Sequence, residues 1–339
     1  MEKKTVSVVM CTYNGEKYLR EQMDSILAQT YPIHEIIVCD DCSTDGTMNI
    51  LQEYATKFPF IKVHRNTRNK GCNQNFHDIF YQVSKKVDYI AISDQDDIWF
   101  PEKIGKLVQL IEKEEGYNLC FSDIISSPTY SRQQTKDYLP LPFTAESLFF
   151  RDNIPGHAML IKRTFIENLK PWSGMTFYYD WLAMNAALTD SIIKCKEPLS
   201  WHRIHSASVI TTVGRKLSKH KPHSPIAPYV YGTYNFFKLR NTESFKCFYN
   251  NIYEKTSPTH HPILHQITKL FNSHNPLDLL RLCFVCMKHR KQIYPHPHKG
   301  KGSIFALRGF FSPFICTYYN IQFYNTETEH NSQLNKKQK

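Results

Sequence analysis

The fold is indicated most clearly by residues 6–47, which read VSVVMCTYNGEKYLREQMDSILAQTYPIHEIIVCDDCSTDGT. Two short runs rich in β-branched residues, 6–10 and 35–39, enclose a longer segment whose apolar residues recur at helical spacing. Residues 43–45, Ser-Thr-Asp, then offer side chains that commonly cap the start of a second helix. Strands that alternate with helices are typical of βαβ units. The stretch therefore predicts an α/β fold, with a mostly parallel sheet flanked by helices.

The same alternation continues along the chain. Further strands are predicted at residues 61–64, 89–93 and 119–124, with a short strand at 192–195. Helices are predicted at residues 16–28, 75–84, 104–111 and 181–188, and a polar loop at 125–145. Because these elements suffice for one sheet with helices on its faces, we expect a single α/β domain over residues 1–212.

Charge separates this domain from the rest of the chain. Residues 1–210 carry 23 Lys and Arg against 26 Asp and Glu, whereas residues 211–339 carry 19 against 5, a net charge of +14. The second segment also holds ten of the sixteen histidines. We expect residues 213–339 to form a basic, aromatic, mainly helical region behind a linker. The linker is marked by Pro222, Pro225 and Pro228, and the helices are predicted near residues 262–272 and 276–291.

Composition excludes several classes of protein. With 41% hydrophobic and 22% charged residues, the chain is globular rather than disordered. It contains neither a secretory signal nor an apolar run of about 18 residues, so we expect a cytoplasmic protein. The composition of the basic region suits peripheral contact with the anionic inner face of the cell membrane. The alternative is that the basic region is only solvated. We find no nucleic-acid recognition motif and expect no nucleic-acid partner.

Polar residues follow each predicted strand, at the edge where the carboxyl ends of parallel strands gather ligands. Six of them are acidic: Asp40, Asp41, Asp45, Asp94, Asp96 and Asp97. Carboxylates packed together repel one another, so such a cluster is most easily explained by a divalent cation, Mg²⁺ or Mn²⁺. The alternative, that the acids only cap helices, applies best to Asp45 and Asp97. GxGxxG and GxxxxGK[ST] patterns are absent, so a nucleotide diphosphate would depend on that metal.

Three blocks of sequence carry a resemblance to a known family. They are residues 6–47 quoted above, NKGCNQNF at 69–76 and YIAISDQDDIWFPEKI at 89–104. In order and spacing the blocks resemble glycosyltransferase family 2, the inverting GT-A fold enzymes, and most closely its bacterial rhamnosyltransferase-like branch. The resemblance implies a metal-dependent hexosyltransferase or rhamnosyltransferase. Such an enzyme moves a sugar from a nucleotide-diphosphate donor to a hydroxyl of a glycan or lipid-linked acceptor, in synthesis of bacterial surface polysaccharide such as O-antigen, capsule or exopolysaccharide.

The resemblance also implies roles for individual residues. It assigns Asp96 and His205 to the metal, and Asp180 to the general base that removes the acceptor proton. The residues implied to bind the donor are Thr12, Tyr13, Asn14, Asp40, Asn69, Lys70, Asp94, Gln95 and Arg203. Two alternatives stay open: Asp180 caps a helix that begins at Trp181, and Arg203 and His205 lie in a basic surface turn. The run that holds them has Ser208 where the family has asparagine.

Other readings of the same residues are weaker. A sugar nucleotidyltransferase would also use an acidic metal site, but it would carry a Gly-rich basic loop near its N-terminus. An inactive binding protein with this fold would not need all of the acidic residues named above. The pairs Cys39/Cys42 and Cys283/Cys286 have zinc-like spacing, yet core packing is their ordinary explanation. Gly156 and His157 also resemble a family turn close to the acceptor cleft, but a lone histidine there is more often structural, and His157 is interpreted so.

Overall fold

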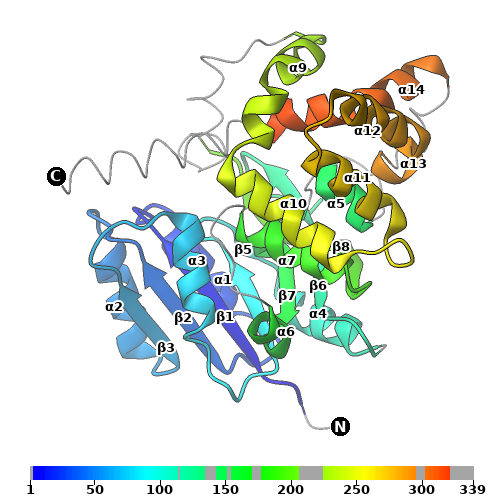
Figure 1. Cartoon of the computed structure of the whole chain (residues 1–339). Helices are drawn as coiled ribbons and strands as arrows, with labels where there is room; N and C mark the ends of the chain where they lie inside the picture. Colours follow the sequence, from blue (N-terminus) through cyan, green and yellow to red (C-terminus); the bar gives the residue numbers. More distant parts are fainter. Residues whose placement is uncertain are drawn as a thin grey trace. The chain divides into compact units, whose positions relative to one another are not determined.

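The computed structural model confirms the α/β fold, with helices on a mixed sheet (Figure 1). The chain divides into two compact units, which we call the sheet unit (Met1–Tyr138 and Ile154–His205) and the helical unit (Leu139–Asn153 and Ser206–Lys339). The predicted boundary between residues 212 and 213 lies outside the described residues. The structure describes residues 3–113, 115–133, 143–150, 154–169, 177–205, 224–294 and 302–320.

The sheet unit holds eight strands and their connecting helices among its described residues. Its strands are β1 (Val6–Thr12), β2 (Glu35–Asp40), β3 (Ile61–Arg65), β4 (Tyr89–Ser93), β5 (Ile98–Trp99), β6 (Leu119–Ser127), β7 (Met159–Lys162) and β8 (Ile192–Arg203). Its helices are α1 (Leu19–Leu27), α2 (Thr47–Lys57), α3 (Cys72–Phe80), α4 (Lys103–Ile111), η1 (Gly156–Ala158), α6 (Arg163–Asn168) and α7 (Tyr178–Ala187).

The strand order places a topological switch point between β1 and β4. The order is β3-β2-β1-β4-β7-β6-β8-β5, and β3, β2, β1 and β4 run parallel. From β1 the chain passes to β2 and β3 on one side, then returns to add β4 on the other side. In sheets of this kind ligands bind in the crevice where the connections diverge, at the carboxyl ends of the two central strands. The ends of β1 and β4 are therefore the place to look for a site.

The central strands are apolar because helices cover both of their faces. Every residue of β1, β2 and β4 is buried. On one face Val6, Val8 and Met10 pack into a core with side chains of α1, α2 and α4. On the other face lies α3, which is drawn in front of the blue strands in Figure 1. Its Phe76 stacks on Tyr178 of α7, with ring centroids 4.2 Å apart. The continuous apolar runs thus reflect burial on two sides.

Several predicted boundaries in the sheet unit are wrong. The helix predicted at 16–28 is α1, which begins at Leu19; the strand predicted at 119–124 is β6, which continues to Ser127; and the helix predicted at 181–188 is α7, which begins at Tyr178. The helix predicted from residue 75 is α3, and it begins at Cys72. The short strand predicted at 192–195 is β8, which continues to Arg203. Beyond residue 195 its sequence contains Lys, Glu and Pro, so no strand pattern is visible there. Pairing with β6, through Ser127 and Arg203 at the far end, extends the strand. The length of β8 is therefore set by its pairing with β6 and not by local β propensity.

The helical unit consists of helices among its described residues. They are α5 (Ala145–Phe150), α9 (Ala227–Arg240), α10 (Glu243–Lys255), α11 (Pro262–Asn272), α12 (Pro276–Lys288), α13 (Arg290–Ile293) and α14 (Ser303–Phe310), and residues 312–320 are also helical. Phe271 of α11 lies at the centre, where its ring contacts Phe149, Phe236, Phe245 and Tyr249. No helix in the described part of the chain combines the length and apolar character needed to cross a bilayer.

The predicted linker is partly wrong. Pro228 lies in the first turn of α9, not in a connection. Proline is tolerated there because its missing N–H would have no intrahelical partner. The prediction of a helix near 262–272 is confirmed by α11, and the helix predicted near 276–291 is α12, which ends at Lys288. Pro222 lies outside the described residues.

Candidate functional site

The loops that follow β1 and β4 are joined by one side chain. The Gln95 amide accepts a hydrogen bond from the Tyr13 N–H (2.9 Å) and donates one to the Tyr13 carbonyl (3.1 Å). Gly15 permits this contact, because a Cβ at that position would lie 2.3 Å from Gln95 Oε1. Tyr13 itself is exposed, with 48% of its surface accessible. The Gln95 side chain thus bridges the two loops at the switch point, and the exposed Tyr13 ring remains accessible to a ligand.

The loops after β1 and β2 are tied together around Asp40. Its carboxylate is fully buried and accepts hydrogen bonds from the Thr12 hydroxyl (3.0 Å) and the Ser43 N–H (2.9 Å). Asn14, which adopts a φ of 48°, accepts a hydrogen bond from the Thr44 N–H (2.8 Å). In this arrangement Asp40 shapes the loops, although it was predicted to contact the donor directly. That contact stays a prediction.

Asp41 positions the loop that leads to α3. One carboxylate oxygen accepts from the Lys70 N–H and the other from the Gly71 N–H, both at 2.8 Å. Gly71 has a φ of 84°, a conformation that favours glycine, and it immediately precedes α3. The Lys70 ammonium pairs with Asp78 at 2.7 Å, and Asn69 accepts a second hydrogen bond from Gly71 at 3.0 Å. Lys70 and Gly71 are therefore held in place by Asp41, a carboxylate for which the sequence suggested no individual role, and Asn69 contacts the same Gly71 N–H.

Two carboxylates at the end of β4 converge on a histidine. His157 Nδ1 lies 3.0 Å from Asp94 Oδ2 and 3.6 Å from Asp97 Oδ2. Among the described residues these three form a group whose candidate ligand atoms lie within 4.8 Å of one another. Asp97 Oδ2 and His157 Nε2 are buried and make no hydrogen bond within the described part of the chain. Two carboxylates and an imidazole with unused ligand atoms are a suitable donor set for a divalent cation such as Mn²⁺.

Burial and charge set the protonation of this group. Burial raises the pKa of Asp97 to about 7, aided by Asp94 and opposed by His157. Burial also acts to lower the pKa of His157, but the charges of Asp97 and Asp94 outweigh it and raise that pKa. The hydrogen bond and charge of His157 in turn outweigh the desolvation of Asp94 and lower its pKa. The arrangement favours an imidazolium beside the Asp94 carboxylate.

A buried cation lies behind the same group. Lys103 of α4 is fully buried and stands over the Trp99 ring, with its ammonium 4.0 Å from the centroid. Burial lowers the pKa of Lys103 to about 7, against the opposing effect of Asp97 and Asp94. His202 of β8 stacks on His157 with ring centroids 5.2 Å apart, and burial lowers its pKa to about 4. At neutral pH His202 is therefore uncharged, and the carboxylates at the strand end are offset by the His157 imidazolium and in part by Lys103.

A second carboxylate–histidine contact lies beside the first. His205 Nε2 is 2.8 Å from Asp96 Oδ2, and its ring packs on Tyr18 at 4.9 Å. Burial and the neighbouring Asp94 raise the pKa of Asp96, opposed by His205. The two residues that the sequence assigned to the metal are thus brought together by the structure.

Arg203 is engaged by the protein itself. Its guanidinium pairs with Glu21 at 2.8 Å and lies over the rings of Tyr18 and Trp201, with centroid distances of 4.4 and 4.6 Å. Its Nε donates to the Asp96 carbonyl at 3.0 Å. These contacts overturn the surface-turn alternative for Arg203. They also show a positioning contact to the Asp96 backbone, whereas its predicted role toward the diphosphate stays a prediction.

Asp180 lies in the first turn of α7. The helix begins at Tyr178 and its N-cap is Phe177, so the alternative that Asp180 caps a helix starting at Trp181 is wrong. The Tyr178 hydroxyl occupies the space beside Gly156, where a Cβ would lie 2.4 Å from it. Burial raises the pKa of Tyr178, and the charge of Asp94 adds to the effect. The start of α7 therefore lies close to the carboxylate cluster.

Two contributors to the site were missed. His157 was interpreted as structural and Lys103 received no role, whereas Asp97 was included in the predicted acidic cluster, with helix capping as its alternative. Lys103 had a visible signal, because it shares the buried face of α4 with Ile104, Leu107 and other apolar residues. A lysine on such a face requires anionic partners. His157 carried only the resemblance of Gly156 and His157 to a family turn, because it is the pairing of β7 with β4 that brings it to Asp94.

Comparison with known proteins identifies the family. The model of "Glycosyl transferase family 2" matches residues 7–180. EpsE of Bacillus subtilis (strain 168), which is named as a glycosyltransferase, is 40% identical over 115 residues, covering 34% of this chain and 41% of EpsE. The dTDP-rhamnosyl transferase RfbG of Shigella flexneri is 32% identical over 190 residues, covering 53% of this chain and 65% of RfbG. The chain therefore spans less than two thirds of the length of either relative.

Solved structures share the fold. S. aureus TarS 1–349, crystallised with UDP, has a TM-score of 0.51 at 15% identity, covering 94% of this chain and 91% of that chain. The mannosyltransferase PcManGT from Pyrobaculum calidifontis, in complex with GDP-Man and Mn²⁺, has a TM-score of 0.50 at 14% identity, covering 94% and 87%. The expected GT-A architecture is thereby confirmed.

Proposed function

Because this chain belongs to glycosyl transferase family 2, we propose that it moves a sugar from a nucleotide-diphosphate donor to a hydroxyl group, with inversion at the anomeric carbon. The proposed acceptor is a glycan or lipid-linked intermediate of a bacterial surface polysaccharide. The similarity to the dTDP-rhamnosyl transferase RfbG makes dTDP-rhamnose the first donor to test, ahead of hexose donors.

The observation that carries the proposal is the meeting of two loops at the switch point of the sheet. One loop follows β1 and presents Tyr13; the other follows β4 and presents Asp94, Asp96 and Asp97. A nucleotide base and ribose fit beside the first loop, and a diphosphate with its counter-ion fits beside the second. The crevice at this point is the usual ligand site of such sheets.

Donor binding is proposed to rest on the first three loops of the sheet. Thr12, Tyr13 and Asn14 would border the base and ribose. Asp40 keeps these residues in place through its hydrogen bonds with Thr12 and Ser43. To accept a hydrogen bond from the imide N–H of a pyrimidine base, Asp40 would have to give up one of them. Lys70 would face the donor from the opposite loop, where Asp41 fixes its backbone.

The residues at the end of β4 fit Mg²⁺ or Mn²⁺. A divalent cation bound there would neutralise charge that develops on the departing diphosphate. Asp96 and His205, paired at 2.8 Å, are one proposed ligand set. Asp94, Asp97 and His157 are the other, and their ligand atoms lie within 4.8 Å of one another. Arg203 holds the Asp96 backbone in either case.

Asp180 is proposed to remove the acceptor proton. Its place in the first turn of α7 puts the carboxylate at the positive end of the helix dipole, a position where an acidic side chain interacts favourably with the helix. Tyr178, in the same turn, packs beside Gly156 and so fixes the start of α7 near the donor crevice. General base catalysis of this kind contributes about 10²- to 10⁴-fold to a rate.

A donor screen tests the proposal. The thermal midpoint of the full chain is measured with dTDP-, UDP- and GDP-sugars, each with and without Mn²⁺. A ligand that binds only the folded protein raises that midpoint. We expect one nucleotide sugar to do so only with Mn²⁺, and its sugar to be transferred to an acceptor. Pyrophosphate release from a nucleoside triphosphate and a sugar phosphate, or donor binding without hydrolysis or transfer, would contradict the proposal.

A further inference from the structure

The outer surface of α12 carries an exposed apolar stripe. Leu277, Leu280 and Phe284 follow one another at helical spacing and are 61%, 48% and 51% exposed. The opposite side of the same helix is buried, at Leu282, Cys283 and Cys286. The helix therefore has two apolar sides, of which only one packs into the helical unit.

The stripe continues onto α14. Phe284 packs against Phe310 of α14, with ring centroids 5.4 Å apart. Gly309 allows the two helices to approach closely, because a Cβ there would lie 3.0 Å from the Cα of Met287 in α12. Ile304 and Leu307 of α14 are 81% and 55% exposed. We call Leu277, Leu280, Phe284, Ile304 and Leu307 the α12–α14 face.

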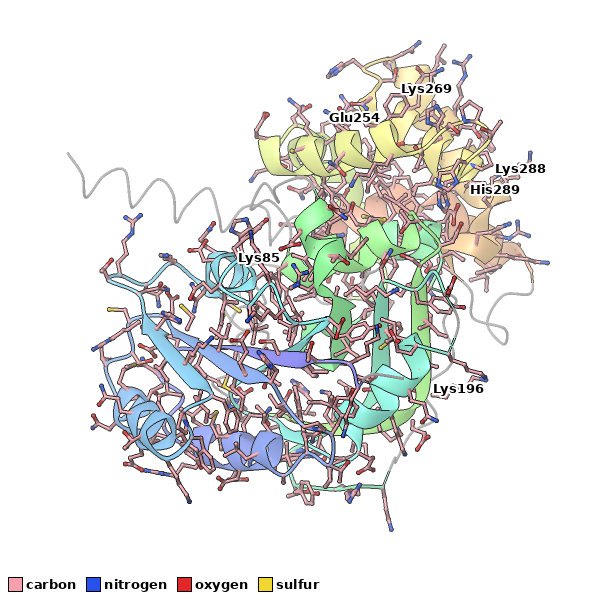
Figure 2. The ribbon with its side chains drawn as sticks, turned by 90° about the horizontal axis from the view of Figure 1, so that it is seen from below. Lys85, Lys196, Glu254, Lys269, Lys288 and His289 are labelled. Atoms are coloured by element: carbon pink, nitrogen blue, oxygen red, sulfur yellow. The ribbon has the colours of Figure 1, made fainter. Side chains whose placement is uncertain are left out.

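Cations outnumber acids on the helices that carry and adjoin the α12–α14 face. Helices α12, α13 and α14 contain five Lys and Arg against one acidic residue. That acid, Asp278, is already bound by Arg281 at 2.7 Å and by the Ser273 hydroxyl at 2.5 Å. Lys288 and Lys291 are exposed, and Figure 2 shows Lys288 at the outer edge of the helical unit. The cations of α12, α13 and α14, which we call the rim, therefore give this region a net positive charge, and its single carboxylate is paired with Arg281.

We propose that the α12–α14 face docks onto an anionic phospholipid bilayer. Helices that lie in a membrane interface combine an apolar stripe with flanking Lys and Arg, as this face does. Each Lys or Arg near an anionic surface contributes about 1 kcal/mol, or roughly fivefold in affinity. A second copy of the chain is a poor occupant, because a two-fold contact would bring the same cationic rims against each other. A neutral apolar partner would leave the rim without counter-charges.

Among the described residues, α9 also carries exposed apolar side chains but fewer cations. Along α9, Ile226, Val230 and Tyr234 are 66%, 66% and 86% exposed. Of the two cations in that helix, Arg240 is buried and donates to the Ser273 carbonyl at 2.6 Å. Charge thus distinguishes the α12–α14 face from the α9 stripe, which provides a matched control.

Co-sedimentation of the full chain with vesicles tests the proposal, in the absence of any nucleotide. We expect binding to vesicles of equal phosphatidylglycerol and phosphatidylcholine, weak binding to phosphatidylcholine alone, and a loss of binding as salt shortens the Debye length. The variant Leu280→Gln/Phe284→Gln should weaken binding by about tenfold or more, since two apolar side chains no longer enter the bilayer. Lys288→Gln/Lys291→Gln should weaken it by about tenfold.

Matched variants decide whether the effect belongs to this face. The control for the apolar variant is Val230→Gln/Tyr234→Gln in α9, which removes two apolar side chains. The control for the charge variant is Lys85→Gln/Lys196→Gln in the sheet unit (Figure 2), which removes two cations. Both controls should leave binding unchanged. Phe284→Leu should retain it. Far-ultraviolet circular dichroism and thermal midpoints check that each variant is folded.

The inference is overturned by any of three results. They are recovery of the full chain in the supernatant with anionic vesicles at low salt, loss of as much binding in the control variants as in the α12–α14 variants, and formation without lipid of a dimer that the α12–α14 variants dissociate. Because lipid binding is measured without donor or acceptor, these results are independent of whether the protein transfers a sugar.

Discussion

The Lys103 ammonium donates a hydrogen bond of 2.7 Å to the main-chain oxygen of His157, so a buried cation of α4 supports the turn that carries a site histidine. The His157 imidazole in turn contacts Asp94 and Asp97. One lysine therefore links the first turn of α4 to both carboxylates at the end of β4. It does so without surface exposure, so its effect on a ligand must pass through the residues it positions.

Lys103→Met is expected to lower the free energy of unfolding by about 3 kcal/mol, because it leaves the buried Asp97 carboxylate with less compensation. The double variant Lys103→Met/Asp97→Asn should recover part of that loss, since the two buried groups whose charges act on each other are removed together. Denaturant titrations of the two single variants and the double variant measure the coupling. Lys106→Met, one turn along α4 in an exposed pair with Glu197, is the control and should cost about 0.5 kcal/mol or less. Additive effects of the two site substitutions would contradict the prediction.

Glu35→Gln should make the sheet unit less sensitive to acid. The Glu35 carboxylate accepts from Lys62 Nζ (2.5 Å), the Ser84 N–H (2.8 Å) and the Ser7 hydroxyl (3.2 Å). Burial alone raises the pKa of Glu35, but these hydrogen bonds and the Lys62 charge outweigh it and lower that pKa below its ordinary value of 4.5. The stabilisation is therefore present above that value and is lost as pH falls through the folded pKa.

At neutral pH we expect Glu35→Gln to cost about 1–3 kcal/mol, the range for a hydrogen bond to a charged group. Thermal midpoints from about pH 6 to about pH 3 should fall more steeply in the unsubstituted protein than in the variant. Glu53→Gln, in the exposed pair with Arg20, is the matched control and should leave the pH profile unchanged. Parallel pH profiles for Glu35→Gln and the unsubstituted protein would sink the prediction.

Asp96→Asn should weaken Mn²⁺-dependent donor binding by about tenfold or more while the fold stays intact, because it removes charge from a repelling cluster. Isothermal calorimetry with a nucleoside diphosphate and Mn²⁺ measures the change. His205→Ala and His157→Ala then distinguish the two ligand sets: the histidine that holds the ion should show the larger loss of metal affinity. Asp123→Asn is the control. The Asp123 carboxylate on β6 is partly buried and pairs with Lys194 of β8. Unchanged affinity in Asp96→Asn would remove this residue from the metal site.

Asp180→Asn should keep donor affinity and lose transfer by about 10²- to 10⁴-fold, since an amide has nearly the same shape but cannot accept a proton. Calorimetry with the donor and a transfer assay with the identified acceptor separate the two effects. Asp190→Asn, in the turn after the same helix with a φ of 49° that asparagine tolerates, provides the control. Turnover of Asp180→Asn within a few-fold of the control would leave Asp180 with a structural role only.

The accuracy of the predictions made from sequence depends on how far apart in the chain the interacting residues lie. The strand at residues 89–93 is confirmed to the residue as β4, because its apolar run reflects burial on both faces. The extent of β8 was not predictable, because its second half is polar and extends only through pairing with β6. That extension carries His202 and Arg203 to the end of β4; Arg203 was assigned to the site from the family resemblance, whereas no role was predicted for His202.

By itself the sequence determined the fold class, the family and the strand ends at which acidic residues gather. Apolar periodicity and short motifs are local properties, and they are written in consecutive residues such as 89–104. Only the tertiary structure decided which groups meet there: His157 reaches Asp94 through the pairing of β7 with β4, and Lys103 reaches His157 across 54 residues of chain. Contacts of that range depend on strand order and helix packing, which no local pattern encodes, because they form only when distant segments are buried together.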